Sequence, residues 1–174
     1  MVSVMAWQVR LRQGVAALRS PSLPADLDTV VGTLLTGEQV TAFRRLPAYD
    51  QVHAFRVYQR LVCAGETDCD VLIAALLHDV GKVMPPFRVR LNDRVARVIL
   101  QRCAPGLLMR LARLPAPRWR AGLALAVHHP MLGAALAATL GCTPRVCWLI
   151  EHHEDAPPPP DAALCRLVGA DREG

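Results

Sequence analysis

The amino-acid sequence predicts an all-α protein, a single domain built as a bundle of about eight or nine helices. Composition is the first reason: 52% of the 174 residues are hydrophobic and only 5% are aromatic. Alanine, leucine and arginine, which favour helices, recur throughout, whereas runs of β-branched residues are short. The distribution of helix-breaking residues is the second reason, because 14 prolines and 11 glycines divide the chain into segments of the length of a helix. A chain of this length can bury roughly 70% of its unfolded surface, enough to enclose a polar site.

The first segments divide into an N-terminal helical extension over residues 1–35 and a main domain over residues 36–174. Thr36 can begin a short helix, since threonine is favoured at helix N-caps. Asp50 can then cap a longer helix that runs to Ala64.

His53 lies on the inward face of that longer helix. It shares a stripe with Val57 and Leu61, at the four-residue spacing that stacks side chains on one face. We therefore expect the imidazole to point towards the core.

The next helix, capped by Asp68, is apolar all round over residues 71–77, which is typical of a central buried helix. His78 and Asp79 follow at its C-terminal end, and Gly81 then releases the chain from the helix. Polar groups at the end of a buried segment need partners.

Residues 88–120 form a basic amphipathic stretch, broken at Pro105, which we regard as a helical insertion. It contains nine arginines and one acid, Asp93, interleaved with aliphatic residues. Two interpretations stay open: an outer helical layer with solvated arginine tips, or a surface that contacts phosphate, nucleic acid or anionic lipid.

The segment His128-His129-Pro130 is expected to join one helix to another, since proline is favoured at the first position of a helix. By the same rule, Thr143 and Pro144 begin the following helix.

Two further helices carry candidate ligands near their ends. His153 completes the apolar stripe of the helix that starts after Thr143, and His152 lies one step round it. In the last helix, Asp171 continues an apolar face with Leu164 and Val168.

The chain carries a net charge of +5, which suits a phosphorylated partner without requiring one. Its only lysine is Lys82, whereas the other 19 basic residues are arginines. The six cysteines form no CxxC pair and no secretory signal precedes them, which predicts reduced thiols and a cytoplasmic location. No uninterrupted run reaches the roughly 18 to 20 apolar residues of a transmembrane helix.

The histidines indicate a metal centre. All six fall at four places on or beside apolar segments: His53, His78, the pair His128-His129 and the pair His152-His153. Imidazole and carboxylate together suit iron, manganese, nickel or zinc, with magnesium as a further candidate. One ion could bind His53, His78, Asp79 and Asp171, and a second could bind His129, His152 and His153 if Asp79 bridges both.

The order of these residues resembles the HD-domain metal-dependent phosphohydrolases, and among them the subgroup with paired metals related to HD-GYP. His53 stands where the family has its first ligand, and residues 74–82, AALLHDVGK, are similar to its HD signature. Three more segments follow in the family order: HPMLG at 129–133 resembles HPxxG, EHHE at 151–154 resembles the HHE segment, and AD at 170–171 resembles the closing AD. The resemblance spans residues from about 50 to 172.

The resemblance implies a pair of divalent metals that share a hydroxide. It assigns His53, His78, Asp79 and Asp171 to one ion, and His129, His152 and His153 to the other, with Asp79 as the bridge. Lys82 matches the family lysine that contacts the substrate phosphate or the bridging hydroxide, so Asp79 and Lys82 are the expected catalytic residues. His128 has no counterpart, although a shift of one residue in register would exchange it with His129.

The chain departs from the HD-GYP pattern after Glu154, because no GYP follows. The loop that accompanies cyclic di-GMP hydrolysis is therefore missing. The expected activity is hydrolysis of a phosphoester, either a phosphodiester or a nucleotide, by a hydroxide held between two metals. Two alternatives remain: a di-iron oxygenase on the same fold, and a non-catalytic module that binds a nucleotide as a sensor.

Overall fold

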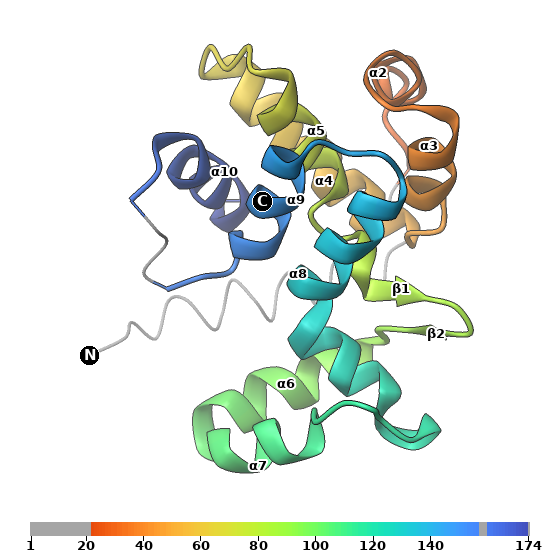
Figure 1. The fold of residues 1–174 in the computed structure, drawn as a ribbon, viewed down its shortest axis with the longest axis vertical. Helices are drawn as coiled ribbons and strands as arrows, with labels where there is room; N and C mark the ends of the chain where they lie inside the picture. The colour runs from red at the N-terminus through yellow and green to blue at the C-terminus, as the bar shows by residue number, and fades with distance from the viewer. Residues whose placement is uncertain (1–21, 157–159, 174) are drawn as a thin grey trace.

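The computed structural model describes residues 22–156 and 160–173, and over these residues the prediction of an all-α fold is confirmed (Figure 1). The first half of the bundle contains α2 (Leu27–Leu34), α3 (Gly37–Arg44), α4 (Ala48–Cys63), α5 (Cys69–Leu77) and the 3-10 turn η1 (Val80–Lys82). A two-stranded antiparallel sheet follows, β1 (Val83–Met84) and β2 (Phe87–Arg88). The second half contains α6 (Leu91–Cys103), α7 (Pro105–Leu111), the 3-10 turn η2 (Arg118–Arg120), α8 (Ala121–Thr139), α9 (Pro144–His152) and α10 (Ala162–Arg172).

Side-chain caps set two of the helix starts that the sequence predicts. The Asp68 carboxylate accepts a hydrogen bond from the backbone N–H of Asp70 at the start of α5. The Thr143 hydroxyl accepts one from the N–H of Val146, with Pro144 at the first position of α9. Each cap satisfies a backbone donor that has no partner within its helix.

Asp50 is not the N-cap that the sequence suggested, so that prediction is wrong. Helix α4 begins two residues earlier, at Ala48, after Pro47 in an extended conformation. Asp50 therefore lies in the first helical turn, where its side chain is 1% exposed and pairs with Arg94 of α6. Asp50 therefore forms an ion pair with a residue distant in the sequence and does not cap its own helix.

The segment around Pro130 corrects a second expectation, because no break separates two helices there. Helix α8 runs unbroken through Pro130. Proline lacks an N–H, so the carbonyl of Ala126, four residues earlier, loses its usual helical donor. That carbonyl accepts hydrogen bonds from Arg97 Nη1 at 2.6 Å and from His129 Nδ1 at 3.2 Å. The carbonyl that Pro130 leaves without a helical donor is therefore satisfied by two other donors.

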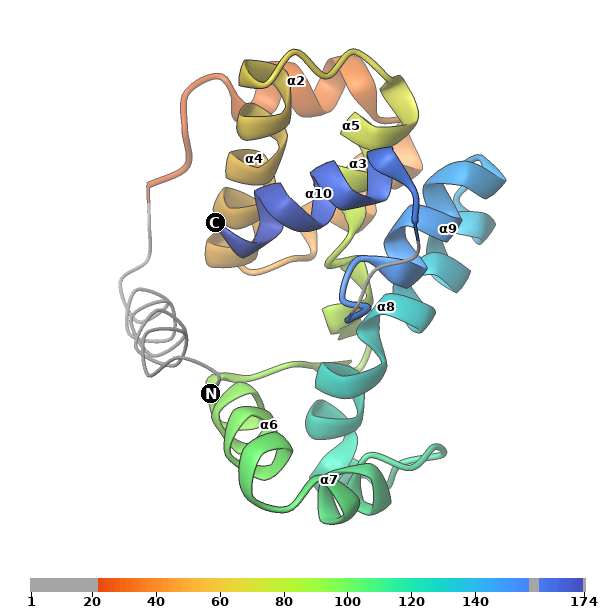
Figure 2. The same cartoon turned by 90° about the vertical axis from the view of Figure 1, so that its left-hand side faces the viewer.

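Helix α5 lies at the centre of the main bundle, with α4, α9 and α10 packed around it (Figures 1 and 2). Six of its nine residues are buried, as the apolar run predicted. Leu27 and Val31 of α2 belong to the same core, so α2 is part of the bundle even though it falls within the N-terminal extension that we defined. Residues 1–21 of that extension lie outside the described residues.

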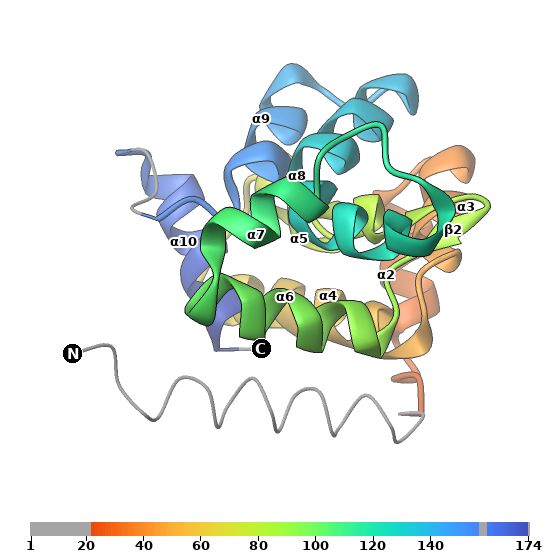
Figure 3. The same cartoon turned by 90° about the horizontal axis from the view of Figure 1, so that it is seen from below.

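Helices α6 and α7 form a separate layer at one end of the molecule, against the N-terminal half of α8 (Figures 1 and 3). No residue of α6 is fully buried, and Val95 and Ile99 are exposed. The insertion is nevertheless more than an outer layer with solvated arginines, because Arg94 and Arg97 pair with carboxylates of the bundle. It therefore takes part in building the interior.

Among the described residues, the stretch Arg118–Thr139 is long and apolar enough to cross a membrane by length and composition alone. The helix is continuous through Pro130 in this stretch. However, 56% of its most apolar window is buried inside the protein. That burial is typical of the core helix of a soluble protein.

Candidate metal centre

Four helices and the turn η1 bring histidines and an aspartate to one place in the bundle. His78 is the C-cap of α5 and Asp79 is the N-cap of η1, so the end of one buried helix delivers two ligand candidates side by side. Three further helices contribute from around them: α4 supplies His53, α8 supplies His129, and the C-terminal end of α9 supplies His153. The side chains of His78, Asp79, His129 and His153 are all at most 2% exposed.

These side chains form two groups that share Asp79. In one group, single ligand atoms of His53, His78 and Asp79 all lie within 4.8 Å of one another, and in the other the same is true of Asp79, His129 and His153. Asp79 Oδ2 lies 3.5 Å from His78 Nε2, whereas Asp79 Oδ1 lies 3.4 Å from His129 Nε2 and 4.0 Å from His153 Nε2. Each oxygen of Asp79 therefore faces a different group. Either group could hold a metal ion.

Three of the imidazole rings are oriented in the same way. The Nδ1 atoms of His78, His129 and His153 bond to the carbonyl oxygens of Ala75, Ala126 and Ile150, each three residues earlier in the chain. A carbonyl can only accept, so Nδ1 carries the proton in each ring. In the neutral ring the lone pair is then on Nε2, which faces the cluster. This arrangement of protonated Nδ1 on a carbonyl and free Nε2 is usual for histidines that bind metals.

Two buried nitrogens support the same conclusion. Nε2 of His78 and Nε2 of His129 are buried and have no hydrogen-bond partner among the described residues. A buried polar atom without a partner costs about 1–3 kcal/mol. A cation between these nitrogens and the Asp79 carboxylate would remove that cost, so the donor set fits a divalent metal.

Asp171 of α10 lies at the edge of the first group. Its Oδ1 is 2.8 Å from His53 Nε2 and 3.5 Å from His78 Nε2. Burial alone would raise the pKa of Asp171, but the hydrogen bond to His53 and the charge of His78 hold it well below its usual range. The carboxylate is thus ionised at neutral pH, as a metal ligand must be.

The two histidine doublets each send only one ring into the cluster. His128 bonds through Nε2 to the carbonyl of Ala112, so His129 is the member of its pair that faces Asp79. His152 belongs to neither group: its Nδ1 lies 2.7 Å from Asp155 Oδ2. The assignment of His152 as a ligand stays a prediction, and the structure does not bring its ring together with the others.

Lys82 lies directly beside the shared carboxylate. Its Nζ is 2.5 Å from Asp79 Oδ2 and 3.9 Å from Asp50 Oδ1. Burial would lower the pKa of Lys82, but the charges of Asp79 and Asp50 raise it. The only lysine of the chain therefore supplies a positive charge beside the cluster, which is the position expected from the sequence.

Gly81 allows η1 to pack against α8 with the two backbones in contact. A Cβ atom at Gly81 would lie 2.1 Å from the carbonyl oxygen of His129 and 2.6 Å from the backbone nitrogen of Gly133. The glycine was expected to release the chain from a helix. Because Gly81 has no side chain, the turn that follows Asp79 can also lie close to the helix that carries His129.

Opposite charges perturb the pKa values within the cluster. Burial alone would lower the pKa of His78, but the charge of Asp79 raises it from 6.5 to about 9. Burial alone would raise the pKa of Asp79, but the charges of His78 and Lys82 hold it well below its usual range. Burial and the neighbouring charge of His78 lower the pKa of His153 to about 4. Without a metal, the cluster thus holds a proton on His78 while His153 stays neutral.

The sequence did not identify four residues around the cluster as site residues: Asp50, Arg94, Arg97 and Glu154. Arg94 Nη2 donates to both oxygens of Asp50, and Arg97 donates to Glu154, whose Oε1 is 3.8 Å from His129 Nε2. Glu154 follows the histidine doublet directly, and the two arginines are three residues apart on one helix face. Those two signals could have directed attention to them.

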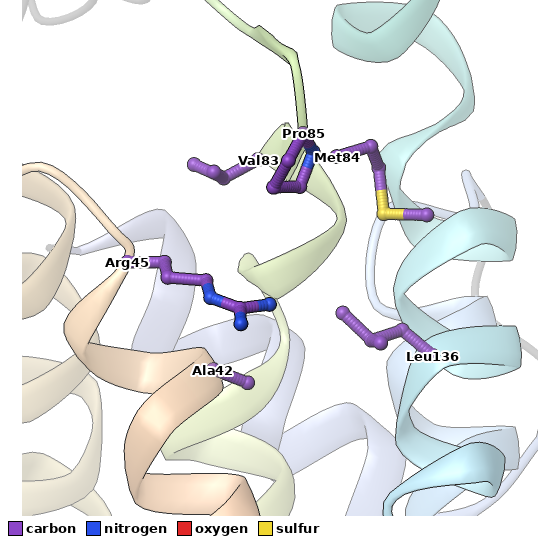
Figure 4. A pocket seen from close by; sticks show the side chains of 6 residues that line it. All are labelled: Ala42, Arg45, Val83, Met84, Pro85 and Leu136. Carbon is purple, nitrogen blue, oxygen red and sulfur yellow. The ribbon is translucent and has the colours of Figure 1, made fainter.

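A small pocket of about 120 Å³ lies between α3, α8 and the segment after η1 (Figure 4). It is lined by Ala42, Arg45, Val83, Met84, Pro85 and Leu136. None of these residues belongs to the histidine and aspartate cluster, and we assign no chemistry to the pocket.

Comparisons with known proteins identify no relative: no family model, no curated protein and no solved structure matches the chain. The resemblance to the HD-domain phosphohydrolases therefore rests on the sequence motifs. What the geometry establishes is a buried cluster of histidines and aspartates that could hold a metal ion.

Proposed function

We propose that the protein is a metal-dependent phosphohydrolase of the HD-domain type, which uses two divalent metal ions to hydrolyse a phosphoester. One observation carries the proposal: two histidine and aspartate groups share Asp79, with the Nε2 atoms of His78, His129 and His153 turned towards it by their Nδ1 hydrogen bonds. A shared carboxylate between two sets of donors suits a pair of metals.

The proposed ligands follow from the two groups. His53, His78, Asp79 and Asp171 would hold one ion, and His129, His153 and Asp79 the other. When bound, two such ions supply Lewis acidity and lower the pKa of a water molecule for attack on phosphorus. The protein holds the rings of His78, His129 and His153 in one tautomer, because the Nδ1–H of each is fixed on a carbonyl.

Lys82 favours a phosphoester over other substrates of a metal site. Its ammonium group lies 2.5 Å from Asp79 Oδ2 and is mostly shielded from solvent, with a side chain that is 17% exposed. A cation held at this point can neutralise negative charge on a phosphoryl group in the transition state.

The test begins with metal analysis of protein purified without added metal. The protein is then reloaded in parallel with iron, manganese, nickel, zinc and magnesium, and assayed on a generic phosphodiester, a phosphomonoester, nucleotides and cyclic dinucleotides. We expect bound metal and turnover of at least one phosphoester. Failure to bind any of these metals, with no turnover on the panel, would refute the proposal. Oxygen consumption without phosphoester turnover would instead support the oxygenase.

The adjacent histidines of α8 supply a matched pair of variants. His129→Ala removes a ring that faces Asp79, whereas His128→Ala removes one that bonds to the carbonyl of Ala112. We expect His129→Ala to lose metal and activity and His128→Ala to retain the metal content of the wild type. The reverse result would mean that the ligand assignment is out of register.

A further inference from the structure

Helix α6 places two arginines on carboxylates that border the metal centre. Arg94 Nη2 lies 2.8 Å from Asp50 Oδ1 and 2.6 Å from Asp50 Oδ2. Arg97, one helical turn further on, donates to Glu154 through both of its terminal nitrogens. Residues three apart on a helix share a face, so this face of α6 is directed towards the site.

The two carboxylates border different parts of the cluster. Asp50 Oδ1 lies 3.9 Å from Lys82 Nζ, and Glu154 Oε1 lies 3.8 Å from His129 Nε2. Asp50 therefore lies between Arg94 and Lys82, and Glu154 lies between Arg97 and the proposed metal ligand His129. The two arginines have different surroundings, and these differences indicate different roles.

Arg97 is occupied with structural contacts. Its Nη1 donates to the Ala126 carbonyl that Pro130 leaves without a helical donor, and also to Glu154. Its Nη2 donates to Glu154 as well. The guanidinium therefore ties three parts of the protein together, and this explains why an arginine is needed there.

The guanidinium of Arg94 has N–H donors that form no hydrogen bond within the described residues. Its bonds to Asp50 both come from Nη2, and no acceptor within residues 22–156 and 160–173 bonds to its Nη1 or Nε. The guanidinium stacks over the ring of Tyr49, 5.6 Å from the centroid. Its side chain is 27% exposed, whereas that of Asp50 is 1% exposed. Nη2 is thus fixed on a buried carboxylate, while the side chain as a whole keeps some exposure to solvent.

We propose that Arg94 binds a phosphoryl oxygen of the substrate beside Lys82, while Asp50 and Tyr49 hold its guanidinium in place. The inference rests on the proposed phosphohydrolase function and names a substrate-binding residue within it. A guanidinium can bond a carboxylate along one side and a phosphate along another, because its donors form a planar fork. Two cations on the same buried carboxylate, Lys82 and Arg94, give a phosphoryl group two positive partners.

A purely structural role would account for only part of this arrangement. A buried Asp50 needs a positive partner, and Arg94 supplies one. That need is met by Nη2 alone. The ion pair does not account for a guanidinium that also lies over an aromatic ring and whose Nη1 and Nε bond to no acceptor within residues 22–156 and 160–173.

The experiment measures binding of inorganic phosphate to the full-length, manganese-loaded protein by isothermal titration calorimetry. It compares the wild type with Arg94→Met, Asp50→Asn and the double variant Asp50→Asn/Arg94→Met. Arg102→Met is the matched control, because it removes the same charge from an exposed position of the same helix. Metal content and thermal melting verify that each variant is folded and loaded. The double variant avoids leaving a buried carboxylate without its partner.

We expect Arg94→Met and the double variant to bind phosphate roughly 10- to 150-fold more weakly, the range for one hydrogen bond to a charged group. Asp50→Asn keeps an acceptor for the guanidinium and should bind nearly as well as the wild type, as should Arg102→Met. If the double variant binds phosphate as tightly as Asp50→Asn, Arg94 is only a counterion and the inference is wrong. Absence of phosphate binding by the wild type would also overturn it.

Turnover measurements separate this inference from the proposed function. An unchanged KM for every phosphoester in Arg94→Met, with phosphate binding also unchanged, would refute the role of Arg94 and leave the phosphohydrolase intact. Arg94-dependent phosphate binding without turnover of any phosphoester would refute the enzyme and leave the anion site.

Discussion

Substitution of Gly81 by alanine tests how closely η1 must approach α8. The new Cβ would lie 2.1 Å from the carbonyl oxygen of His129 and 2.6 Å from the nitrogen of Gly133. An ordinary contact begins near 3.4 Å, so the two backbones would have to separate by about 1.3 Å. Neither obstacle is a side chain that can rotate away. The substitution therefore requires a shift of the helix or of the loop.

The expected cost lies at the upper end of the range for overpacking, about 3 kcal/mol. For a domain of this size, 1 kcal/mol shifts the melting temperature by roughly 2–4 °C, so we expect a loss of about 6–12 °C. The same shift would move His129 relative to Asp79, and metal binding should weaken as well. Thermal denaturation followed by circular dichroism and metal analysis measure the two effects.

Gly32→Ala is the control. Gly32 is exposed within α2, and a Cβ atom there would meet nothing within 4 Å. Alanine is favoured over glycine inside a helix by about 1 kcal/mol, so this variant should be slightly more stable than the wild type. If Gly81→Ala melts within about 1 °C of the wild type and keeps its metal content, the argument from backbone contact is wrong.

Three further predictions concern the cluster itself. Asp79→Ala should abolish metal binding and activity together, whereas Lys82→Ala should keep the metals and lower turnover. Equal metal content in the wild type and Asp79→Ala would contradict the bridging role. His152→Ala should keep the metal content if the pairing with Asp155 persists on metal binding, and loss of one ion would restore His152 as a ligand. The metal-free protein should be most stable near pH 6.5 in urea titrations. The raised pKa of His78 contributes stability that is lost as pH rises from 6.5 through about 9. The lowered pKa of His153 costs stability as pH falls from 6.5 towards about 4. A maximum above pH 8 would contradict the assignment of His78, and a maximum near pH 4 would contradict that of His153.

Much of the fold follows from local patterns in the sequence. The apolar run of α5 predicts a central helix, and Asp68 and Thr143 mark helix starts that the structure confirms. These features depend on residues within a few positions of one another, so a sequence is enough to find them. The inward position of His53 follows from the periodicity of its helix, and that of His78 from its place at the end of a wholly apolar run.

The surroundings of the cluster depend on partners far apart in the chain. Asp50 and Arg94 are 44 residues apart, and Arg97 and Glu154 are 57 apart. Asp50 has the sequence signature of a helix cap, yet its tertiary partner gives it another role. No local pattern distinguishes these two outcomes.

By itself, the sequence determined the helical class, the central helix and the histidines and aspartates that turn towards the interior, because periodicity and caps act within a single helix. Only the tertiary structure decided that α8 passes unbroken through Pro130, that one ring of each histidine doublet enters the cluster, and that α6 borders the site. The physical reason is the same in each case. A backbone carbonyl, an imidazole or a carboxylate takes the partner that folding brings to it, and for Ala126 that partner is an arginine 29 residues away.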